Sequence, residues 1–401
     1  MSINPIKSMS FRLLDRVLGD RASSDLRGLL FPWYQPEIVA SQRTSLIISR
    51  VRFIAALFAL LTPLWIVLDM MFFPPGTYLK LATARLAAAV AFGALALLYH
   101  KSDRLRDAYI ALALMFMIPT LFFVYSHMLF TSSGAQLTGF TASLVTGYAF
   151  LPFIMAAGLS VFPLTALEGL IFALPALFAE LLSSAFGSSF ISQDAHLGMI
   201  WLFALIATIA ILAGMSQLHY LSEIVIKSSH DPLTGAFTRG AGEELLEKYY
   251  LMARRNNIPL TLIFMDLDNF KSVNDTYGHE AGDEVLRNAA QAILQQIRKE
   301  DLLVRWGGEE FLLVLPHADG KDPASTMKRL GSHGIGLRPD GTPLTASLGQ
   351  AEYLRDRPRD LAEFIDIADR RMYRAKSSGK NRLCYGEDPS ELTVDWAPGA
   401  S

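Results

Sequence analysis

Long apolar runs fill the first half of the chain, and shorter runs separated by charged residues fill the second half. Six of the long runs approach the roughly 20 residues with which an α-helix crosses a bilayer. They lie at 53–73, 78–99, 108–130, 137–157, 161–182 and 197–220. The pattern therefore predicts an N-terminal all-α domain of six transmembrane helices.

The second half alternates between helical and strand-like patterns, which indicates an α+β domain with one central, mainly antiparallel sheet. This domain is expected at 231–386, before a flexible tail at 387–401. Helices are expected at 240–255, 281–299, 323–330 and 361–377, strands at 259–265, 343–352 and 382–385, and a hairpin at 301–315.

A helical linker at 215–230 is expected to join the two halves, because the last apolar run continues without a break. Leu218, Leu221 and Val225 follow one another at helical spacing and form one apolar seam. The linker is either a short parallel coiled coil or a stalk that packs on its own domain. It is expected to end before Pro232, since a residue that precedes proline avoids helical geometry.

Charge and composition agree with insertion into a membrane. Of the 401 residues 51% are hydrophobic. The loop at 101–106 is basic, whereas the loops near 74–77, 131–136 and 183–196 contain no Lys or Arg. Because basic loops stay in the cytoplasm, both termini are expected there. The net charge of −2 gives no sign of nucleic-acid binding, and the single cysteine excludes an intramolecular disulfide.

The cytoplasmic segment at 1–52 holds eight basic residues and no pattern typical of a cleaved signal peptide. Phe11, Leu14 and Leu18 have helical spacing. They predict either an interfacial helix on an anionic membrane surface or a solvated helix that packs on the cytoplasmic domain.

Several ionisable residues lie within the expected spans, among them Arg85, His127, Glu168 and Glu180, and such residues are costly there and point to function. Arg85 is expected to extend toward water, and His127 and Glu180 are close enough to span ends to reach it. Glu168 is nearer a span interior, where it either lines a ligand cavity or pairs with another span.

Two acidic positions of the second domain are expected to meet. The hairpin turn carries Glu309 and Glu310 after a pair of glycines, which would let the backbone take positive φ and approach a ligand. The strand at 259–265 ends at Asp266. Carboxylates delivered by a strand end and a rigid turn suit Mg²⁺, and two such sources make a two-metal phosphoryl-transfer site plausible.

The region from 231 to about 385 resembles the GGDEF domain of bacterial diguanylate cyclases, here in its GGEEF form. Six ordered blocks carry the resemblance, which is far more specific than a lone glycine-rich loop. The blocks are 231–235, 265–275, 277–283, 307–311, 347–349 and 368–382.

The resemblance implies a palm-like fold of the nucleotidyl cyclase and polymerase type, and an enzyme that joins two GTP into cyclic di-GMP with release of two pyrophosphates. It also implies a homodimer or higher homo-oligomer in the bacterial inner membrane. The six-span region is similar in layout to membrane-associated sensor domains, and it leaves the membrane-domain ligand unidentified.

The resemblance also assigns the metal and catalytic positions. Asp266 would bind two Mg²⁺, for which Mn²⁺ can substitute, and Leu267 would offer its carbonyl oxygen. Glu309 would complete the metal site and act as the general base. Glu310 would be a further catalytic carboxylate.

The resemblance implies the following contacts with nucleotide. The backbone amides of Asn269, Phe270 and Lys271 would cradle the phosphates, and Lys376 and Lys380, on one face of a helix end, would bind the triphosphate. Asn274 and Asp283 would bind the guanine base, and His279 would line the pocket that holds it.

A product site is implied by Arg298 and Asp301, whose spacing matches the position at which relatives bind cyclic di-GMP as a feedback inhibitor. Arg329 is a candidate second contact.

The stretch 236–240 departs from the family pattern where the linker meets the domain. The departure bears on how the linker is coupled to the domain more than on the chemistry of the site. The alternatives are a catalytically inactive nucleotide-binding membrane receptor and a transporter with a regulatory domain, and the latter lacks paired broken helices.

Overall fold

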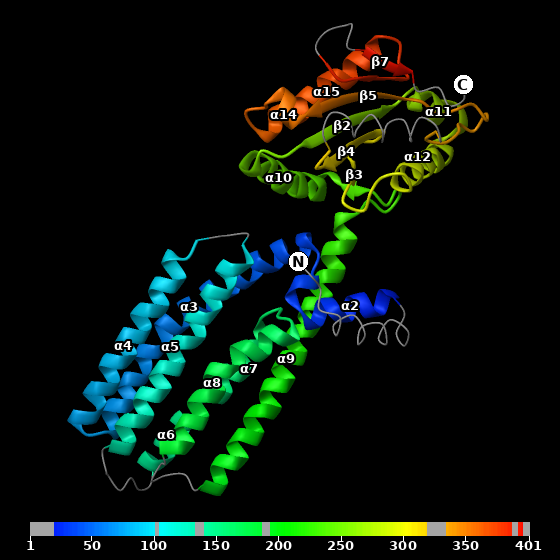
Figure 1. Ribbon diagram of the computed structural model, residues 1–401. Coiled ribbons are helices and arrows are strands. Elements are labelled where there is room, and N and C mark those ends of the chain that lie inside the picture. Colours follow the sequence, from blue (N-terminus) through cyan, green and yellow to red (C-terminus); the bar gives the residue numbers. More distant parts are fainter. Residues whose placement is uncertain are drawn as a thin grey trace. The chain divides into compact units, whose positions relative to one another are not determined.

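The computed structural model describes residues 20–100, 104–132, 140–186, 193–318, 334–386 and 392–395. Its contacts divide the chain into two compact units, Met1–Val225 and Ile226–Ser401 (Figure 1). The first unit is helical, and the second contains a seven-stranded sheet with helices.

The first unit contains six helices that are long and apolar enough to cross a membrane, as the hydrophobic runs predict. Its described helical elements are α2 (Asp20–Leu30), η1 (Pro32–Tyr34), α3 (Glu37–Phe72), α4 (Pro75–Leu98), α5 (Leu105–Ser132), α6 (Phe140–Ala149), α7 (Leu151–Gly158), η2 (Leu159–Val161), α8 (Ala166–Phe186) and α9 (Gln193–Ser229).

Two expected spans differ from the structure in detail. The first helix begins at Glu37 and not near 53, because the segment before 53 is itself helical and buries Ile47 and Val51. The fourth span consists of α6 and α7 with a break at Phe150. Pro152 accounts for the break, since proline has no N–H to donate within a helix. The proposed helix at Phe11 to Leu18 lies outside the described residues.

Arg85 does not extend toward water, contrary to the expectation from sequence. It is buried, and its Nε donates to Asp69 Oδ2 at 2.6 Å. An ion pair formed inside the protein balances the charge of the guanidinium where burial would otherwise be costly.

Glu168 pairs with another span, one of its two expected roles. Its carboxylate accepts from Arg43 of α3 and from the hydroxyl of Tyr109 of α5. The backbone amide of Thr165 donates to the same carboxylate at 2.7 Å. The three contacts fix α3, α5 and the start of α8 at one polar point.

Glu180 does not reach water, since it is buried, and within the described part of the chain neither carboxylate oxygen has a hydrogen-bond partner. Its nearest charge partner is His196 of α9, at 3.9 Å. His127 is half-buried beside Ser183, 3.3 Å away. Packing between α5, α8 and α9 therefore encloses side chains that sequence position alone places near the span ends.

The helix α9 runs from the last span through the linker and ends at Ser229, three residues before Pro232, as predicted. Leu218 and Val225 are buried on it, and Leu221 is half-buried. The predicted apolar seam is therefore largely covered.

The second unit is an α+β domain whose sheet has the order β1-β3-β4-β2-β5-β6-β7. Four of the six neighbouring pairs are antiparallel, and β1–β3 and β5–β6 are parallel. The strands are β1 (Phe237–Thr238), β2 (Leu260–Leu267), β3 (Leu302–Arg305), β4 (Glu310–Pro316), β5 (Ala346–Glu352), β6 (Arg382–Cys384) and β7 (Leu392–Asp395). The helices are α10 (Arg239–Asn256), α11 (Phe270–Tyr277), α12 (His279–Leu294), α14 (Tyr353–Asp356) and α15 (Leu361–Ser377).

The strand β2 is buried along its whole length, because both of its faces are covered. Ile263 and Met265 pack in one core cluster with residues of α11 and α12. On the other face α15 approaches closely at Gly349 of β5, where a Cβ atom would fall 2.0 Å from the carbonyl oxygen of Ala368. Only glycine fits this crossing, and it fixes α15 beside the end of β2.

Several short elements were not predicted from the sequence, namely β1, α11, α14 and β7. The helix expected at 281–299 begins at His279, after Gly278 with φ +83°, and ends at Leu294. A tighter turn replaces its last part, since Gln296 N donates to Ile293 O. The short helix expected at 323–330 lies outside the described residues.

Candidate active site

The central strands bring the predicted carboxylates together. In the antiparallel ladder between β2 and β4, Asp266 is the partner of Glu310. The next amide, that of Leu267, donates to the carbonyl oxygen of Glu309 at 3.3 Å. The register of two buried strands therefore fixes the strand end and the hairpin turn next to each other.

A lysine from α15 completes this cluster. Lys376 Nζ donates to Asp266 Oδ2 at 2.8 Å. The other carboxylate oxygen, Oδ1, is buried and has no hydrogen-bond partner among the residues that the structure describes. An unpaired buried carboxylate oxygen is costly and is a candidate ligand for a cation.

The charges of the cluster shift its pKa values. Burial, followed by the negative charge of Asp266, raises the pKa of Glu309, and Lys376 partly offsets this. Burial and the Asp266 charge likewise raise the pKa of Glu310. Burial opposes the charged form of Lys376, but its hydrogen bond to Asp266 and the surrounding carboxylates raise its pKa overall. The site holds more negative charge than its lysine neutralises.

These residues fit Mg²⁺ by their chemistry. Hard cations prefer carboxylate and carbonyl oxygens, and the cluster offers a buried carboxylate oxygen without a partner beside further acids. In the described part of the chain, no three His, Cys, Asp or Glu side chains form a ready metal cage. Magnesium commonly keeps several water and substrate ligands, so a site of few protein ligands is typical for it.

The turn uses the room that glycine leaves by lacking a Cβ atom, and it does not use positive φ. Neither Gly307 nor Gly308 is among the described glycines with a left-handed backbone, contrary to the expectation from sequence. A Cβ atom on Gly307 would fall 2.3 Å from Glu310 Oε2. Gly307 therefore leaves room for the Glu310 carboxylate, which folds back over it, whereas a Cβ at Gly308 meets open space.

The predicted phosphate-binding amides lie directly after β2, where α11 begins. Asn269 has left-handed geometry with φ 57°, and the helix starts at Phe270. The first amides of a helix have no intrahelical acceptors, so those of Phe270 and Lys271 can bind an anion. The side chain of Asn269 accepts a hydrogen bond from Lys380.

Lys376 and Lys380 do not share a helix face, contrary to the expectation from sequence. The helix α15 ends at Ser377, and Gly379 with φ +119° turns the chain away. Lys380 itself has φ 61°. The two lysines nonetheless reach the same strand end, because Lys376 contacts Asp266 and Lys380 contacts Asn269.

The three predicted guanine-binding residues lie on α11 and α12, two helices that contact each other. Asn274 Oδ1 covers Gly282, where a Cβ atom would fall only 1.9 Å away. Asp283 follows Gly282 and is exposed, and His279 is the exposed first residue of α12. Gly282 thus lets the Asn274 amide approach the backbone beside the Asp283 carboxylate.

Two acids near the site were not assigned from the sequence. Asp268 is buried and accepts from Ser347 Oγ at 2.6 Å, from Thr345 Oγ1 at 2.8 Å and from the Asn381 amide at 2.9 Å. It therefore ties β5 and the chain after α15 to the end of β2. Its place in the 265–275 block was the available signal.

Asp369 of α15 is the second such acid. Its negative charge contributes to the raised pKa of Glu310. Burial, then the charges of Asp366 and Asp266, raise the pKa of Asp369 itself. Helical spacing places Asp369 two turns before Lys376, on the same side of α15. That spacing was visible in the sequence.

The turn is also connected to the beginning of the domain. Arg305 Nη1 donates to Asp231 Oδ1 at 3.0 Å, and Arg305 Nη2 donates to the carbonyl oxygen of Gly308 at 3.0 Å. The segment 236–240, which departs from the expected pattern, forms β1 beside β3, and Arg239 stacks over the Trp306 ring at 4.6 Å. Contacts from the start of the second domain therefore reach the turn at 307–310.

The predicted product-site residues lie in one tight turn after α12. The amide of Arg298 donates to Asp301 Oδ2 at 2.7 Å, and the amide of Asp301 donates back to Arg298 O at 3.1 Å. Asp301 is buried and Arg298 is exposed. The Asp301 carboxylate thus has a structural role in the turn. Arg329 lies outside the described residues.

Known proteins are similar to the part of the chain that holds this site. The family described as "Diguanylate cyclase, GGDEF domain" matches residues 228–382. Diguanylate cyclase DosC of Escherichia coli strain K12 is 34% identical over 162 residues, which are 38% of this chain and 34% of DosC. YhcK of Bacillus subtilis strain 168, named an uncharacterized protein, is 33% identical over 196 residues, 45% of this chain and 54% of YhcK.

Among solved structures, the coiled coil and GGDEF domain of DgcB from Caulobacter crescentus, in complex with c-di-GMP, is similar to 42% of this chain. The similarity covers 90% of the DgcB chain, with 26% identity and a TM-score of 0.37. The chain spans about a third of the length of DosC and about half of YhcK.

Proposed function

Because residues 228–382 are a GGDEF domain, we propose that this chain is a diguanylate cyclase, which joins two GTP into cyclic di-GMP and releases two pyrophosphates. The observation that carries the proposal is the cluster of Asp266, Glu309 and Lys376 at the end of β2. A degenerate domain that had lost turnover would have no need to keep acids crowded beside a strand end at an electrostatic cost.

Asp266, Glu309 and the Leu267 carbonyl would hold two Mg²⁺, or Mn²⁺ in their place. The buried, unpartnered Oδ1 of Asp266 supports this assignment. At such a site bound Mg²⁺ acidifies the attacking 3′-hydroxyl and offsets phosphate charge.

The residues of the chain then divide the remaining work. Glu309 accepts the proton of the 3′-hydroxyl, a role that its raised pKa favours. Glu310 keeps the turn closed by folding over Gly307. Lys376 and Lys380 bind the triphosphate, and the amides of 269–271 orient it.

Guanine selectivity is assigned to α11 and α12. The carboxylate of Asp283 accepts from the N1–H and the exocyclic amine of guanine, a pair of donors that adenine lacks. Asn274 binds the base from the neighbouring helix, and His279 lines the same pocket. The exposure of Asp283 and the contact between the two helices support this arrangement.

The reaction requires two domains, because each binds one GTP and the two nucleotides attack each other. The enzyme is therefore a homodimer or a higher homo-oligomer. The six-helix unit anchors it in the bacterial inner membrane, with both termini in the cytoplasm, and controls turnover as a sensor. Cyclic di-GMP bound at Arg298 and Asp301 inhibits the enzyme as its product.

The test is turnover of GTP with Mg²⁺ by the purified full-length protein, after bound cyclic di-GMP has been removed. The parent chain and Glu247→Gln, a change of an exposed acid on α10, should form cyclic di-GMP, and Glu309→Gln should not. If the parent binds GTP but forms no product across Mg²⁺ and Mn²⁺ concentrations, the cyclase assignment fails and a nucleotide-binding receptor replaces it.

A further inference from the structure

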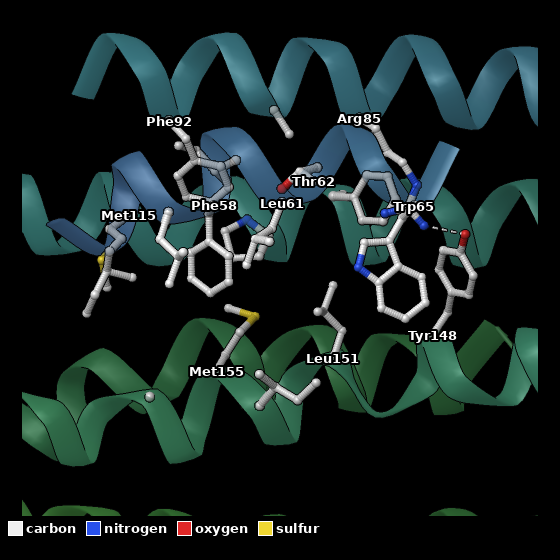
Figure 2. Close-up of a pocket in the computed structure, with 18 of the residues that line it drawn as sticks. Phe58, Leu61, Thr62, Trp65, Arg85, Phe92, Met115, Tyr148, Leu151 and Met155 are labelled. Carbon is white, nitrogen blue, oxygen red and sulfur yellow. Dashed lines mark hydrogen bonds between the residues drawn. The ribbon is translucent and has the colours of Figure 1, made fainter. Parts of the chain in front are cut away.

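A cavity of about 800 Å³ lies inside the first unit. Its lining comes from α3, α4, α5, α6 and α7, together with the residues just after α3 and α7. Figure 2 shows Phe58, Leu61 and Trp65 on one side of this space, opposite Leu151 and Met155. The volume falls within the roughly 300–1,000 Å³ of sites that bind small molecules.

The cavity is apolar along most of its length and polar at one end. Arg85 Nε donates to Asp69 Oδ2 at 2.6 Å. Arg85 Nη2 donates to the hydroxyl of Tyr148 at 2.5 Å (Figure 2). The same hydroxyl donates to Asp69 Oδ1 at 2.5 Å. All three residues line the cavity.

One nitrogen of this polar end is left for a ligand. Arg85 is 6% exposed, and its Nε and Nη2 are used by Asp69 and Tyr148. Among the described residues, none accepts a hydrogen bond from Nη1. A guanidinium carries two N–H donors on that nitrogen, so a buried side chain that lines the cavity retains unused donors.

Aromatic rings hold the guanidinium in place. Its central carbon lies 4.9 Å from the ring centre of Phe122, 5.3 Å from that of Tyr148 and 5.9 Å from that of Trp65. Cation–π contacts with the rings and the ion pair with Asp69 fix the position of Nη1. The donors are therefore preorganised before any ligand arrives.

We propose that this cavity binds an uncharged, bilayer-soluble molecule that carries a carbonyl oxygen at one end of a largely apolar body. The carbonyl oxygen accepts from Arg85 Nη1, and the apolar body lies along Phe58, Leu61 and Met155.

Charge and hydrogen bonding select this class. Asp69 already balances Arg85, so an anionic head would bring an uncompensated charge into an apolar cavity, which is costly. A pure hydrocarbon would leave the Nη1 donors without an acceptor. A neutral carbonyl meets both conditions, and quinone rings and acyl esters are two sources of it.

The access route agrees with a ligand that comes from the bilayer. Leu61 and Trp65 of α3 line the cavity and are 41% and 51% exposed. Since α3 is an apolar helix long enough to cross a membrane, a cavity that opens along it would open toward lipid. A molecule dissolved in the bilayer can enter there without crossing water.

The test measures saturable binding of four radiolabelled probes to the full-length protein in nanodiscs, with empty nanodiscs as background. The probes are decylubiquinone, methyl laurate, laurate at pH 8 and dodecane. At least one carbonyl probe should bind ten-fold or more tightly than laurate and dodecane, and the tighter of the two identifies a quinone or an ester. Equal or tighter binding of laurate or dodecane, or no saturable binding, would overturn the proposal.

A matched pair of glycine variants locates the site. A Cβ atom at Gly147 or at Gly93 meets nothing within 4 Å, but only Gly147 lines the cavity. Gly147→Leu should weaken binding of the carbonyl probe at least ten-fold, and Gly93→Leu should leave it unchanged. Equal effects of both variants would contradict the location.

A second variant keeps the test valid if Gly147→Leu fails to fold. The double change Arg85→Met with Asp69→Leu removes the donors and leaves no unpaired charge. It should abolish the preference for carbonyl probes over dodecane while dodecane binding persists. None of these binding measurements depends on GTP, so their results are independent of whether the chain is a cyclase.

Discussion

The ammonium nitrogen of Lys376 lies 2.8 Å from Asp266 Oδ2, so a cation of the chain itself holds the carboxylate at the end of β2. The same lysine lowers the pKa of Glu309 and Glu310 against burial and the Asp266 charge, which raise it. Lys376 therefore sets how readily the neighbouring acids ionise, in addition to any role toward phosphate.

The first prediction concerns this electrostatic role. Because their pKa values lie above the ordinary 4.5, Glu309 and Glu310 take up protons as pH falls toward that value, and metal affinity should fall with them. Lys376→Gln should move the loss of affinity to higher pH. Mn²⁺ binding measured by electron paramagnetic resonance from pH 4.5 to 8 checks this. Glu247→Gln is the control, and an unmoved profile in Lys376→Gln would refute the role.

The second prediction concerns base selection. Asp283→Asn replaces an acceptor with a mixed donor and acceptor, so guanine loses a charge-assisted hydrogen bond worth about 1.5–3 kcal/mol. GTP affinity of the full-length protein should fall about 10- to 100-fold, while the weaker affinity for ATP stays within about two-fold. Calorimetric titration measures both. The adjacent exposed acid offers a matched control, since Glu284→Gln should leave GTP affinity unchanged.

The third prediction concerns the connection between the linker end and the turn. Arg305 donates to Asp231 and to Gly308 O from two nitrogens of one planar group. Arg305→Lys keeps the positive charge but cannot donate to Asp231 and Gly308 O from two nitrogens of one planar group. The turnover number for GTP should fall at least ten-fold with a loss of stability of about 1 kcal/mol or less. Unchanged turnover would show that the turn holds its geometry without Arg305.

The fourth prediction concerns stability and pH. Arg371 is buried and contacts Asp356 through two hydrogen bonds, at 2.7 and 3.0 Å. Burial opposes ionisation of Asp356, but Arg371 and the Glu352 amide lower its pKa below the ordinary value. A lowered folded-state pKa contributes stability that is complete above pH 3.8 and is lost as pH falls through the folded pKa.

The substitution Asp356→Asn therefore tests this pair. It should destabilise the second unit by about 3–5 kcal/mol at neutral pH, because the buried guanidinium of Arg371 loses the carboxylate that balances its charge. The difference from the parent should shrink as pH falls below 3.8. Thermal unfolding of the full chain followed at several pH values measures this. A difference that stays constant down to pH 2.5 would contradict the assignment.

Local pattern was sufficient to predict the long elements. Apolar length gave the six membrane-crossing helices, and the buried run before Asp266 gave β2. The same pattern could not place α11, because Gly278 divides one helical stretch into two. Pro152 alone did not predict the break at Phe150, because Pro63, Pro119 and Pro175 lie inside helices that continue.

A local sequence pattern could not predict which side chains pair with the buried charges. Arg85 and Asp69 are 16 residues apart on different helices, and Arg43 and Glu168 are 125 apart. Only tertiary packing decides whether such a charge reaches water or another side chain. The same holds for Lys376, which meets Asp266 across 110 residues because Gly349 lets α15 approach the sheet.

The uninterrupted course of α9 has a consequence for how a stimulus can travel. Each residue of an α-helix advances it by 1.5 Å and rotates it by about 100°. Gln193 and Ser229 therefore keep a fixed angular phase, which a change in length resets. Inserting seven residues near Ser222 restores the phase to within about 20°, whereas inserting two turns it by about 200°. The rate of cyclic di-GMP synthesis plotted against insertion length should oscillate with the helical period. Such a result would mean that α9 transmits a signal through its rotational phase and does not merely connect the two units.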